Sequence, residues 1–245
     1  MKLLISTMYH HVNSDRCSNE YSIFESHLAY ISENMTAVFP SDERLEKNSI
    51  CLVFDDGYFD FYHLIYPLLK KYKLKVLLGV VPSVTLDKTD KSIQARLAPE
   101  HNHLFSEYKN GTFCTYEELK EMQDSGLVRI ASHSLTHVNL LEDGVNLRAE
   151  LQESQALLEK KLGTKVESFI FPFGKYNQAV LDETKKYYKY AFRIGNGVNP
   201  DFSGVSGVIY RIDADNLKDA SSIFSFKNML KFRLKSLTKR LVGNG

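Results

Sequence analysis

The sequence is short of the features that mark several large classes of protein. It has no tryptophan, six prolines and three cysteines, Cys17, Cys51 and Cys114. The cysteines are an odd number at wide spacing with no Cys-x-x-Cys pair, which argues against a disulfide framework and a thiolate zinc site. No apolar run approaches the roughly 18 residues of a membrane-spanning helix. We therefore expect a globular protein of a reducing compartment.

An excess of charge of one sign is also lacking. The 31 Lys and Arg residues balance 30 Asp and Glu residues, and the net charge is +1. Nucleic acid is therefore not an expected partner, because nucleic-acid-binding domains usually carry a basic excess. Residues 1–11 begin like a signal peptide, but their apolar run stops short of the roughly 7 residues that an export signal needs. We expect a first strand there, and a cytoplasmic protein.

Seven apolar runs of strand length recur along the chain. They lie at residues 3–8, 50–54, 76–81, 127–131, 168–171, 190–194 and 208–212. Between most of them, apolar residues at helical spacing predict helices over residues 23–34, 59–72, 116–125, 146–162 and 178–188. This alternation predicts an α/β fold with mainly parallel strands, in which a single barrel is wrapped by helices. The longest irregular stretch, residues 82–111, contains Arg96, His101 and His103 and is either an active-site loop or a surface insertion.

Two adjacent carboxylates, Asp55 and Asp56, follow one of the predicted strands, and Gly57 closes the turn after them. An acidic turn is the plain interpretation, since Asp-Gly is a common turn signal. However, ligands bind at the carboxyl ends of strands in α/β proteins, and paired carboxylates repel each other unless a cation or a proton is present. The pair therefore indicates metal binding or acid–base chemistry.

Two histidines, His133 and His137, follow another predicted strand. Their four-residue spacing is known from zinc sites, although eight histidines in this length also produce such a pair by chance. Together with the two aspartates they offer two imidazoles and one carboxylate for a metal, with positions left open for water. The second carboxylate is then free to act as a base.

A third motif, at residues 171–174, breaks a strand with Pro172 and Gly174. A simple strand exit would look the same. In a functional interpretation the proline makes the turn rigid, so that the N–H of Phe173 can be aimed at a developing oxyanion. The rings of Phe173 and Tyr176 would offer faces to a sugar, and we expect Pro172, Phe173 and Tyr176 to contact the substrate.

Three motifs together resemble those of the polysaccharide deacetylase family in their order and spacing. They are Phe-Asp-Asp-Gly at residues 54–57, His-Ser-Leu-Thr-His at 133–137 and Phe-Pro-Phe-Gly at 171–174. This is the NodB-homology domain of carbohydrate esterase family 4. The resemblance covers roughly residues 1–216. It implies a distorted (β/α)7 barrel, a divalent metal and hydrolytic removal of N-acetyl groups from amino sugars. Zinc is the expected metal, while cobalt, nickel and iron accept the same ligands.

The resemblance also assigns roles to individual residues. It implies that Asp55 is the general base, that Asp56, His133 and His137 bind the metal, and that a water on the metal is the nucleophile. The N–H of Phe173 would complete the oxyanion site. The chemistry of the residues agrees, because a divalent cation lowers the pKa of its water and polarises an amide carbonyl.

Two positions depart from the family pattern. Ile170 stands where the family has the arginine that holds the base, and Arg193 and Arg211 are the candidates to replace it. No histidine follows His137, although the family uses a late histidine as general acid. The candidates for the acid are Asp213, Asp215, His10 and His11. The open alternatives are a sugar deformylase, an O-acetyl esterase, a carbohydrate-binding barrel without turnover and a structural metal site.

The end of the chain, residues 221–245, differs from the predicted barrel at residues 1–220. It has no acidic residue and six basic ones, and its apolar residues recur at three- and four-residue spacing. This pattern predicts a basic amphipathic helix, which either packs on the barrel or attaches to an anionic membrane. We therefore expect a cytoplasmic protein, peripheral at the inner membrane face, with an N-acetylated saccharide as substrate.

Overall fold

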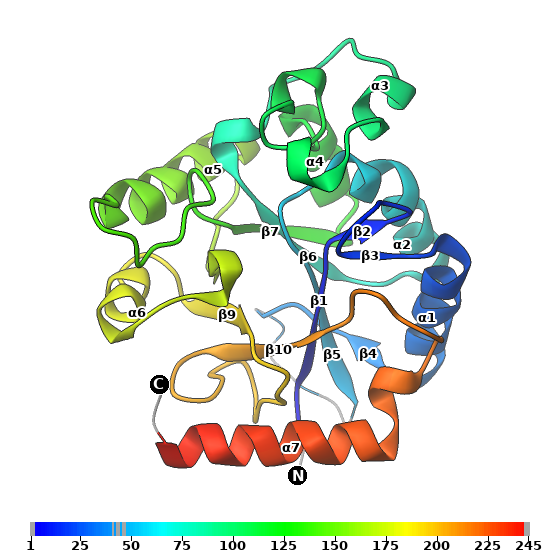
Figure 1. The fold of residues 1–245 in the computed structure, drawn as a ribbon, viewed down its shortest axis with the longest axis vertical. Helices are drawn as coiled ribbons and strands as arrows, with labels where there is room; N and C mark the ends of the chain where they lie inside the picture. The colour runs from blue at the N-terminus through cyan, green and yellow to red at the C-terminus, as the bar shows by residue number, and fades with distance from the viewer. Residues whose placement is uncertain (1–2, 41, 43–44, 46–47, 243–245) are drawn as a thin grey trace.

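Seven parallel strands close into a barrel in this computed structural model, which describes residues 3–40, 42, 45 and 48–242 (Figure 1). The strands are β1 (Ile5–Tyr9), β5 (Ser49–Phe54), β6 (Val76–Val80), β7 (Val128–Ser132), β8 (Ser168–Ile170), β9 (Tyr190–Ile194) and β10 (Ile209–Asp213). The barrel closes because β1 pairs with β5 on one side and with β10 on the other. All seven predicted strands and the predicted (β/α)7 barrel are confirmed.

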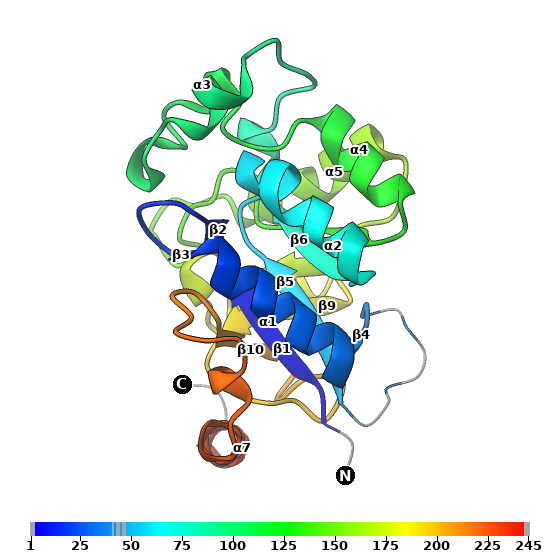
Figure 2. The same cartoon turned by 90° about the vertical axis from the view of Figure 1, so that its right-hand side faces the viewer.

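The strands are mostly apolar because both faces of the sheet are largely buried. On β5, Cys51 and Val53 belong to a cluster inside the barrel, whereas Leu52 and Phe54 pack outward under the helices. Phe24 on α1 (Tyr21–Asn34), for example, meets the ring of Phe54 edge to face. Figure 2 shows α1 lying along this outer side of the barrel. The alternating faces fix which residues at the strand ends point into the barrel mouth.

The helices follow the strands as predicted, with local differences. They are α2 (Tyr66–Tyr72), α3 (Ile93–Leu97), α4 (Tyr116–Asp124), α5 (Ser154–Leu162), α6 (Gln178–Thr184) and α7 (Phe226–Val242). Single π-helical turns, Phe61–Ile65 and Ala149–Glu153, run directly into α2 and α5. Three short strands were not predicted: β2 (His11–Val12), β3 (Ser18–Asn19) and β4 (Thr36–Ala37). They are too short for a periodic pattern to be recognised.

The long insertion at residues 82–111 forms α3 and several 3-10 turns at one end of the barrel (Figure 1). Arg96 on α3 is buried, its guanidinium pairs with Glu118, and its Nε–H donates to the carbonyl oxygen of Gly111 (2.7 Å). The same guanidinium lies 3.3 Å from the centre of the Phe59 ring. Arg96 is therefore the anchor that attaches the insertion to the barrel.

The C-terminal segment forms the predicted helix, α7, which lies at the opposite end of the molecule from α3 (Figures 1 and 2). Phe232 is buried against the barrel, and the hydroxyl of Ser236 accepts a hydrogen bond from the N–H of Val198 (2.8 Å). Residues 243–245 of the predicted tail lie outside the described residues, and the division at residue 220 stays a prediction. Within the described ranges, no helix is both long and apolar enough to span a bilayer.

Candidate active site

The two aspartates lie where β5 ends, at the carboxyl edge of the barrel. The N–H of Asp55 donates to the carbonyl oxygen of Tyr9 on the neighbouring β1 (2.9 Å), which continues the strand pairing by one residue. Asp56 then adopts a left-handed backbone conformation (φ 68°). This turn sends the two side chains to different sides of a cavity of about 450 Å³ that both of them line.

The two histidines are held by a tight loop after β7. The N–H of His133 donates to the carbonyl oxygen of Val80 on β6, and the N–H of His137 donates to the hydroxyl of Ser134 (both 2.9 Å). Both Ser134 and His137 have positive φ, as does Asp56. Left-handed backbone costs a non-glycine residue roughly 1–2 kcal/mol, and such residues gather at functional sites. Here they turn His137 back toward His133.

Glu150, in the π-helical turn before α5, fixes this loop. Its carboxylate accepts hydrogen bonds from the N–H groups of Leu135 and Thr136 (3.0 Å each) and from the Thr136 hydroxyl (2.7 Å). Sequence reasoning missed Glu150, because nothing in its local pattern relates it to the histidines. Thr136 therefore supports the loop, as Ser134 does, rather than hydrogen bonding to an imidazole.

Asp56, His133 and His137 form a donor set that fits a divalent cation. The Oδ1 atom of Asp56 lies 3.2 Å from Nε2 of His137 and 3.5 Å from Nε2 of His133. This oxygen is buried and has no hydrogen-bond partner among the described residues. Burial lowers the pKa of His133 to about 4, so its imidazole is neutral, and its Nδ1–H donates to the carbonyl oxygen of Ile170 (2.8 Å). The Nε2 lone pair is then free for a metal.

A second group of three donors, His10, Cys17 and Asp215, lies at the edge of the same cavity. Here the imidazole and the carboxylate are already joined, because Nδ1 of His10 donates to Oδ2 of Asp215 (2.7 Å). Among the described residues, this group has no buried side-chain oxygen without a hydrogen-bond partner, whereas Oδ1 of Asp56 is such an oxygen. Of the two groups, Asp56 with the two histidines of the loop therefore fits a divalent cation better.

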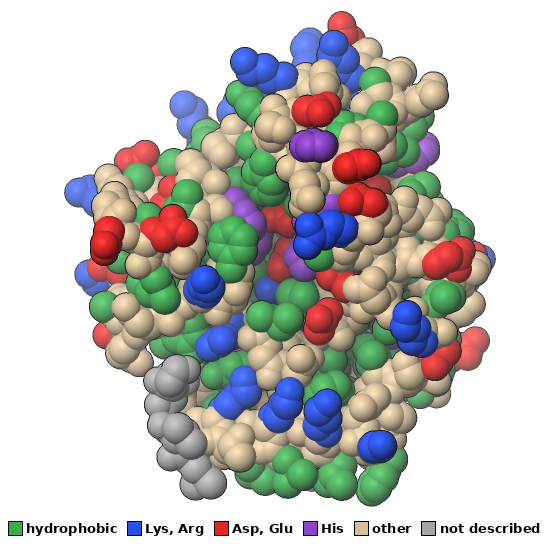
Figure 3. Space-filling view, in the orientation of Figure 1, with side chains coloured by type: hydrophobic (Ala, Val, Ile, Leu, Met, Phe, Trp, Pro, Cys, Tyr) green, Lys and Arg blue, Asp and Glu red, His purple; other side chains and the backbone are tan. Residues whose placement is uncertain are grey.

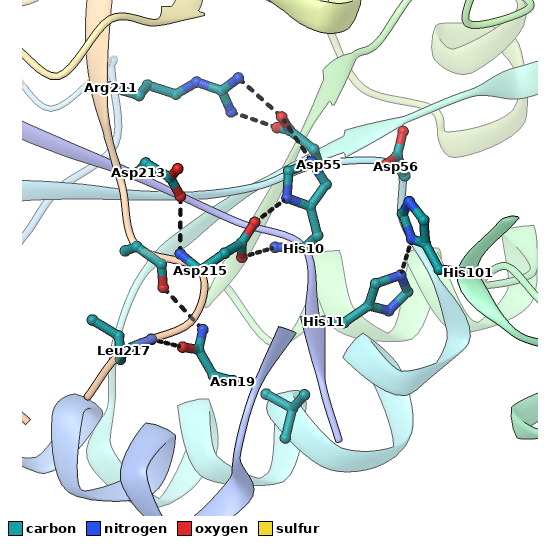
Figure 4. A network of polar contacts seen from close by, with 12 residues as sticks. His10, His11, Asn19, Asp55, Asp56, His101, Arg211, Asp213, Asp215 and Leu217 are labelled. Atoms are coloured by element: carbon teal, nitrogen blue, oxygen red, sulfur yellow. Dashed lines mark hydrogen bonds and ion pairs between the residues drawn. The ribbon is translucent and has the colours of Figure 1, made fainter. Parts of the chain in front are cut away.

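Asp55 is held by Arg211, one of the two predicted candidates. The guanidinium makes a two-point contact with the carboxylate, with Nη2 2.9 Å from Oδ2, and Arg211 is only 1% exposed (Figure 4). Burial alone would raise the pKa of Asp55, but the charge of Arg211 outweighs it and keeps that pKa below its ordinary value. Asp55 is therefore an ionised carboxylate in a fixed orientation. The structure places Arg193 elsewhere, over the ring of Tyr176.

His10 lies beside Asp55, with its Nε2 atom 3.8 Å from Oδ2 of the aspartate (Figure 4). Burial would lower the pKa of His10, but the hydrogen bond to Asp215 and the nearby Asp55 carboxylate outweigh burial and raise it to about 9. The imidazole is therefore protonated at neutral pH. Asp213, the acid candidate named with Asp215, is exposed, and its carboxylate accepts a hydrogen bond from the N–H of Asp215 (3.1 Å).

The third motif forms the predicted tight turn. Pro172 begins it, and Phe173 has positive φ (57°). The backbone bonds within the turn are donated by Gly174 and Lys175, which leaves the Phe173 N–H outside them. The Phe173 side chain is 60% exposed and lines the cavity.

Two of the predicted substrate contacts are set back from the cavity. Pro172 and Tyr176 are not among the residues that line it. The ring of Tyr176 instead stacks on Phe171, which does line the cavity, with ring centres 4.8 Å apart. Tyr176 therefore supports the wall of the cavity from behind, through Phe171.

The insertion contributes a further wall. His101, Asn102 and Phe105 line the cavity, so the insertion belongs to the wall of the candidate site and is more than a surface decoration. The ring of Phe105 stacks on His137 (5.0 Å between centres). His11, named as an acid candidate, instead contacts Asp60 and His101 (3.2 Å each).

Another hollow, of about 310 Å³, lies at the amino-terminal edge of the barrel. Phe39, Arg129 and Tyr190 line it, and no histidine does. Ligands of parallel barrels bind at the carboxyl edge, where the charged side chains described above converge. In the space-filling view, a hollow with histidine and acidic side chains opens toward the viewer (Figure 3).

Residues 42–191 match the polysaccharide deacetylase family, and the chain belongs to this family. It is 26% identical over 195 residues to the Bacillus subtilis (strain 168) protein YxkH, which is named a polysaccharide deacetylase. This match covers 73% of this chain and 60% of that protein. It is also 26% identical over 183 residues to the poly-beta-1,6-N-acetyl-D-glucosamine N-deacetylase of Escherichia coli O157:H7, over 63% of this chain and 26% of that protein. The chain thus spans less than two thirds of these relatives.

Solved structures show the same fold. The Streptococcus pyogenes deacetylase PplD, solved in complex with acetate, superposes with a TM-score of 0.73 at 23% sequence identity. The superposition covers 94% of this chain and 97% of that one.

Proposed function

We propose that the protein is a metal-dependent hydrolase that removes N-acetyl groups from an amino sugar in a glycan or glycan precursor. One observation carries the proposal. A buried donor set for a cation, an ionised carboxylate and a protonated imidazole converge on one cavity at the carboxyl edge of the barrel. The names of the relatives support an N-acetylated saccharide as the substrate class.

Asp56, His133 and His137 would hold the metal. When bound, a divalent cation supplies a water of lowered pKa and polarises the amide carbonyl. Two imidazoles and one carboxylate favour zinc, although cobalt, nickel and iron accept the same set.

Asp55 acts as the general base in this proposal. It takes a proton from the attacking water as the new carbon–oxygen bond forms at the amide carbon. Arg211 keeps the carboxylate ionised and oriented, because both of its Nη atoms contact Asp55. Arg211 on β10 therefore holds the base, which is the role of the family's arginine at the position where this chain has Ile170.

His10 is the general acid that the late part of the sequence lacks. The carbon–nitrogen bond breaks as His10 gives its Nε2 proton to the leaving amine, and the products are acetate and the free amino sugar. The carboxylate of Asp215 on Nδ1 orients the imidazole and keeps it charged. A barrel that only binds carbohydrate would not need this pair.

The turn at Phe173 completes the site. The N–H of Phe173, which lies outside the backbone bonds of the turn, is the donor for the oxyanion that develops on the carbonyl oxygen. The exposed ring of Phe173 and the ring of Phe105 stand on either side of His137 and offer apolar faces to a sugar.

The experiment is acetate release from a panel of N-acetylated saccharides. Purified protein is loaded separately with zinc, cobalt and nickel and compared with Asp55→Asn. We expect release that depends on metal and is lost in Asp55→Asn, while that variant still binds one metal per chain. Formate release from formyl sugars, or acetate release from O-acetyl esters alone, would instead identify the deformylase or the esterase. Full metal binding without any product would indicate a carbohydrate-binding protein without turnover.

A cytoplasmic location of the protein stays a prediction.

A further inference from the structure

One edge of the molecule carries a ridge of exposed apolar side chains. Phe226 is 84% exposed, and Leu230, Leu234 and Leu237 are each about half exposed, all on α7. At 3.6 residues per turn, these four positions fall within an arc of about 80°. Single exposed apolar residues are ordinary on a protein surface, but a continuous ridge along one helix indicates an interaction surface.

The helix is fixed so that this ridge faces away from the barrel. On the opposite side, Phe232 is buried, and the Ser236 hydroxyl accepts from the N–H of Val198 and donates to the carbonyl oxygen of the same residue (2.8 Å each). Near the end of the helix, the ammonium of Lys239 lies 3.7 Å from the centre of the Tyr210 ring. These contacts prevent the helix from rotating to bury the ridge.

Basic side chains flank the ridge on both sides. By the same helical geometry, Lys227 and Lys231 lie beside one edge of the apolar arc, and Arg233 and Arg240 beside the other. All four are exposed, and residues 221–245 contain no acidic side chain to pair with them. Figure 3 shows basic side chains in a row along this helix, with apolar side chains protruding at its outer edge.

We propose that α7 docks on the surface of an anionic lipid bilayer. Its ridge enters the boundary between headgroups and acyl chains, while the flanking Lys and Arg side chains contact the acidic headgroups. Charge complementarity selects this partner. Two copies of the chain packed ridge against ridge would bring basic flanks together, and no acidic residue on the helix could pair with them.

Docking in this way sets the orientation of the cavity. The row of basic side chains lies between the ridge and the hollow of the active site, on the same face of the molecule (Figure 3). When the ridge enters the bilayer, the mouth of the cavity therefore opens sideways, above the lipid surface and on the face that carries the basic row. A saccharide that extends from a lipid headgroup would approach the cavity from this side, an extension that rests on the proposed function.

Vesicle flotation tests the docking itself, without any need for catalysis. The full chain is mixed with phosphatidylcholine vesicles and with vesicles that also contain phosphatidylglycerol, at low and high salt. We expect binding to the anionic vesicles that weakens with salt. Replacing Lys227, Lys231 and Arg233 with Gln should weaken it on the order of 100-fold, since each basic residue near such a surface contributes about fivefold. Leu230→Ser with Leu234→Ser should weaken it about three- to tenfold per leucine, since each leucine is about half exposed and gains about half of its full burial on docking.

Matched controls change the same chemistry far from α7. Lys88, Lys91 and Lys109 are exposed in the insertion, and their replacement with Gln should leave vesicle binding unchanged. Ile93→Ser with Leu141→Ser is the control for loss of exposed apolar area. Equal thermal unfolding midpoints would show that all variants fold.

The proposal is overturned by either of two results. One is binding that is absent, or that does not distinguish neutral from anionic vesicles. The other is a dimer in light scattering that the Leu230→Ser, Leu234→Ser variant converts to a monomer, because the ridge would then be an interface between copies. Since no arm measures turnover, loss of deacetylase activity and loss of docking remain separate outcomes.

Discussion

If the protein acts as proposed, Asp215→Asn should change the pH profile of acetate release more than it changes the fold. In the structure, the carboxylates of Asp215, Asp55 and Asp56 outweigh burial and raise the pKa of His10 from its ordinary 6.5 to about 9. At about 1.4 kcal/mol per pKa unit, this shift favours the imidazolium by about 3 kcal/mol. Asparagine keeps a hydrogen-bond acceptor at position 215 but removes the charge that contacts Nδ1. An opposite charge at this distance shifts a pKa by about 1–3 units, so the pKa of His10 should fall by that amount.

The assay is kcat/KM for acetate release between neutral and alkaline pH. Because a general acid acts only while protonated, activity of the wild type should fall as the pH rises through about 9. In Asp215→Asn the same fall should begin about 1–3 pH units lower. Asp213→Asn is the matched control, since the Asp213 side chain is exposed and accepts a hydrogen bond from the N–H of Asp215 rather than from His10. An unchanged alkaline limb in Asp215→Asn, with metal content intact, would refute the assignment of His10 as the acid.

The same shift affects stability in a defined direction. The pKa of His10 is raised in the folded state, so its stabilising contribution is complete below pH 6.5 and is lost as the pH rises through about 9. Asp215→Asn should therefore destabilise the wild-type fold most near neutral pH and least above pH 9. Urea unfolding at both pH values measures this difference.

Three further outcomes follow from the geometry. Arg211→Met should lower the free energy of unfolding by about 3–5 kcal/mol in urea titrations, because it leaves the buried Asp55 charge unpaired. A loss below about 1 kcal/mol would contradict a stabilising pair between Arg211 and Asp55. Glu150→Gln should weaken metal binding about 10–100-fold in chelator competition, since Glu150 orients the histidine loop; equal affinity would exclude that role. Chelation should stop acetate release while circular dichroism shows a folded barrel, whereas unfolding would indicate a structural metal.

The sequence was sufficient for the barrel and for the gathering of Asp56, His133 and His137 at one site, because both follow from local patterns. Strand runs buried on both faces have a clear apolar signature. Asp56, His133 and His137 each follow such a run, and parallel strands bring their carboxyl ends to one edge. Sequence reasoning therefore placed them together without knowing the register of the strands.

The partners of these residues could not be chosen from the sequence. Asp55 and Arg211 are 156 residues apart, and His10 and Asp215 are 205 apart. Arg193 and Arg211 both lie on strands next to each other, and only the side-chain direction separates them: Arg211 points into the barrel, whereas Arg193 lies over Tyr176 on the outside. Asp213 and Asp215 pose the same problem, because the backbone after β10 decides which of them reaches His10.

The departure at Ile170 has a physical explanation in the barrel interior. Ile170 points inward toward β6, where it packs so closely on Gly79 that an added Cβ there would lie 2.8 Å from its Cδ1 atom. Position 170 is thus filled by an apolar contact between strands. A buried carboxylate still requires a cation, because an unpaired charge in the interior is costly. Since all seven strands end at the same edge, β10 can supply that cation as Arg211, and the requirement of Asp55 is met from a different strand.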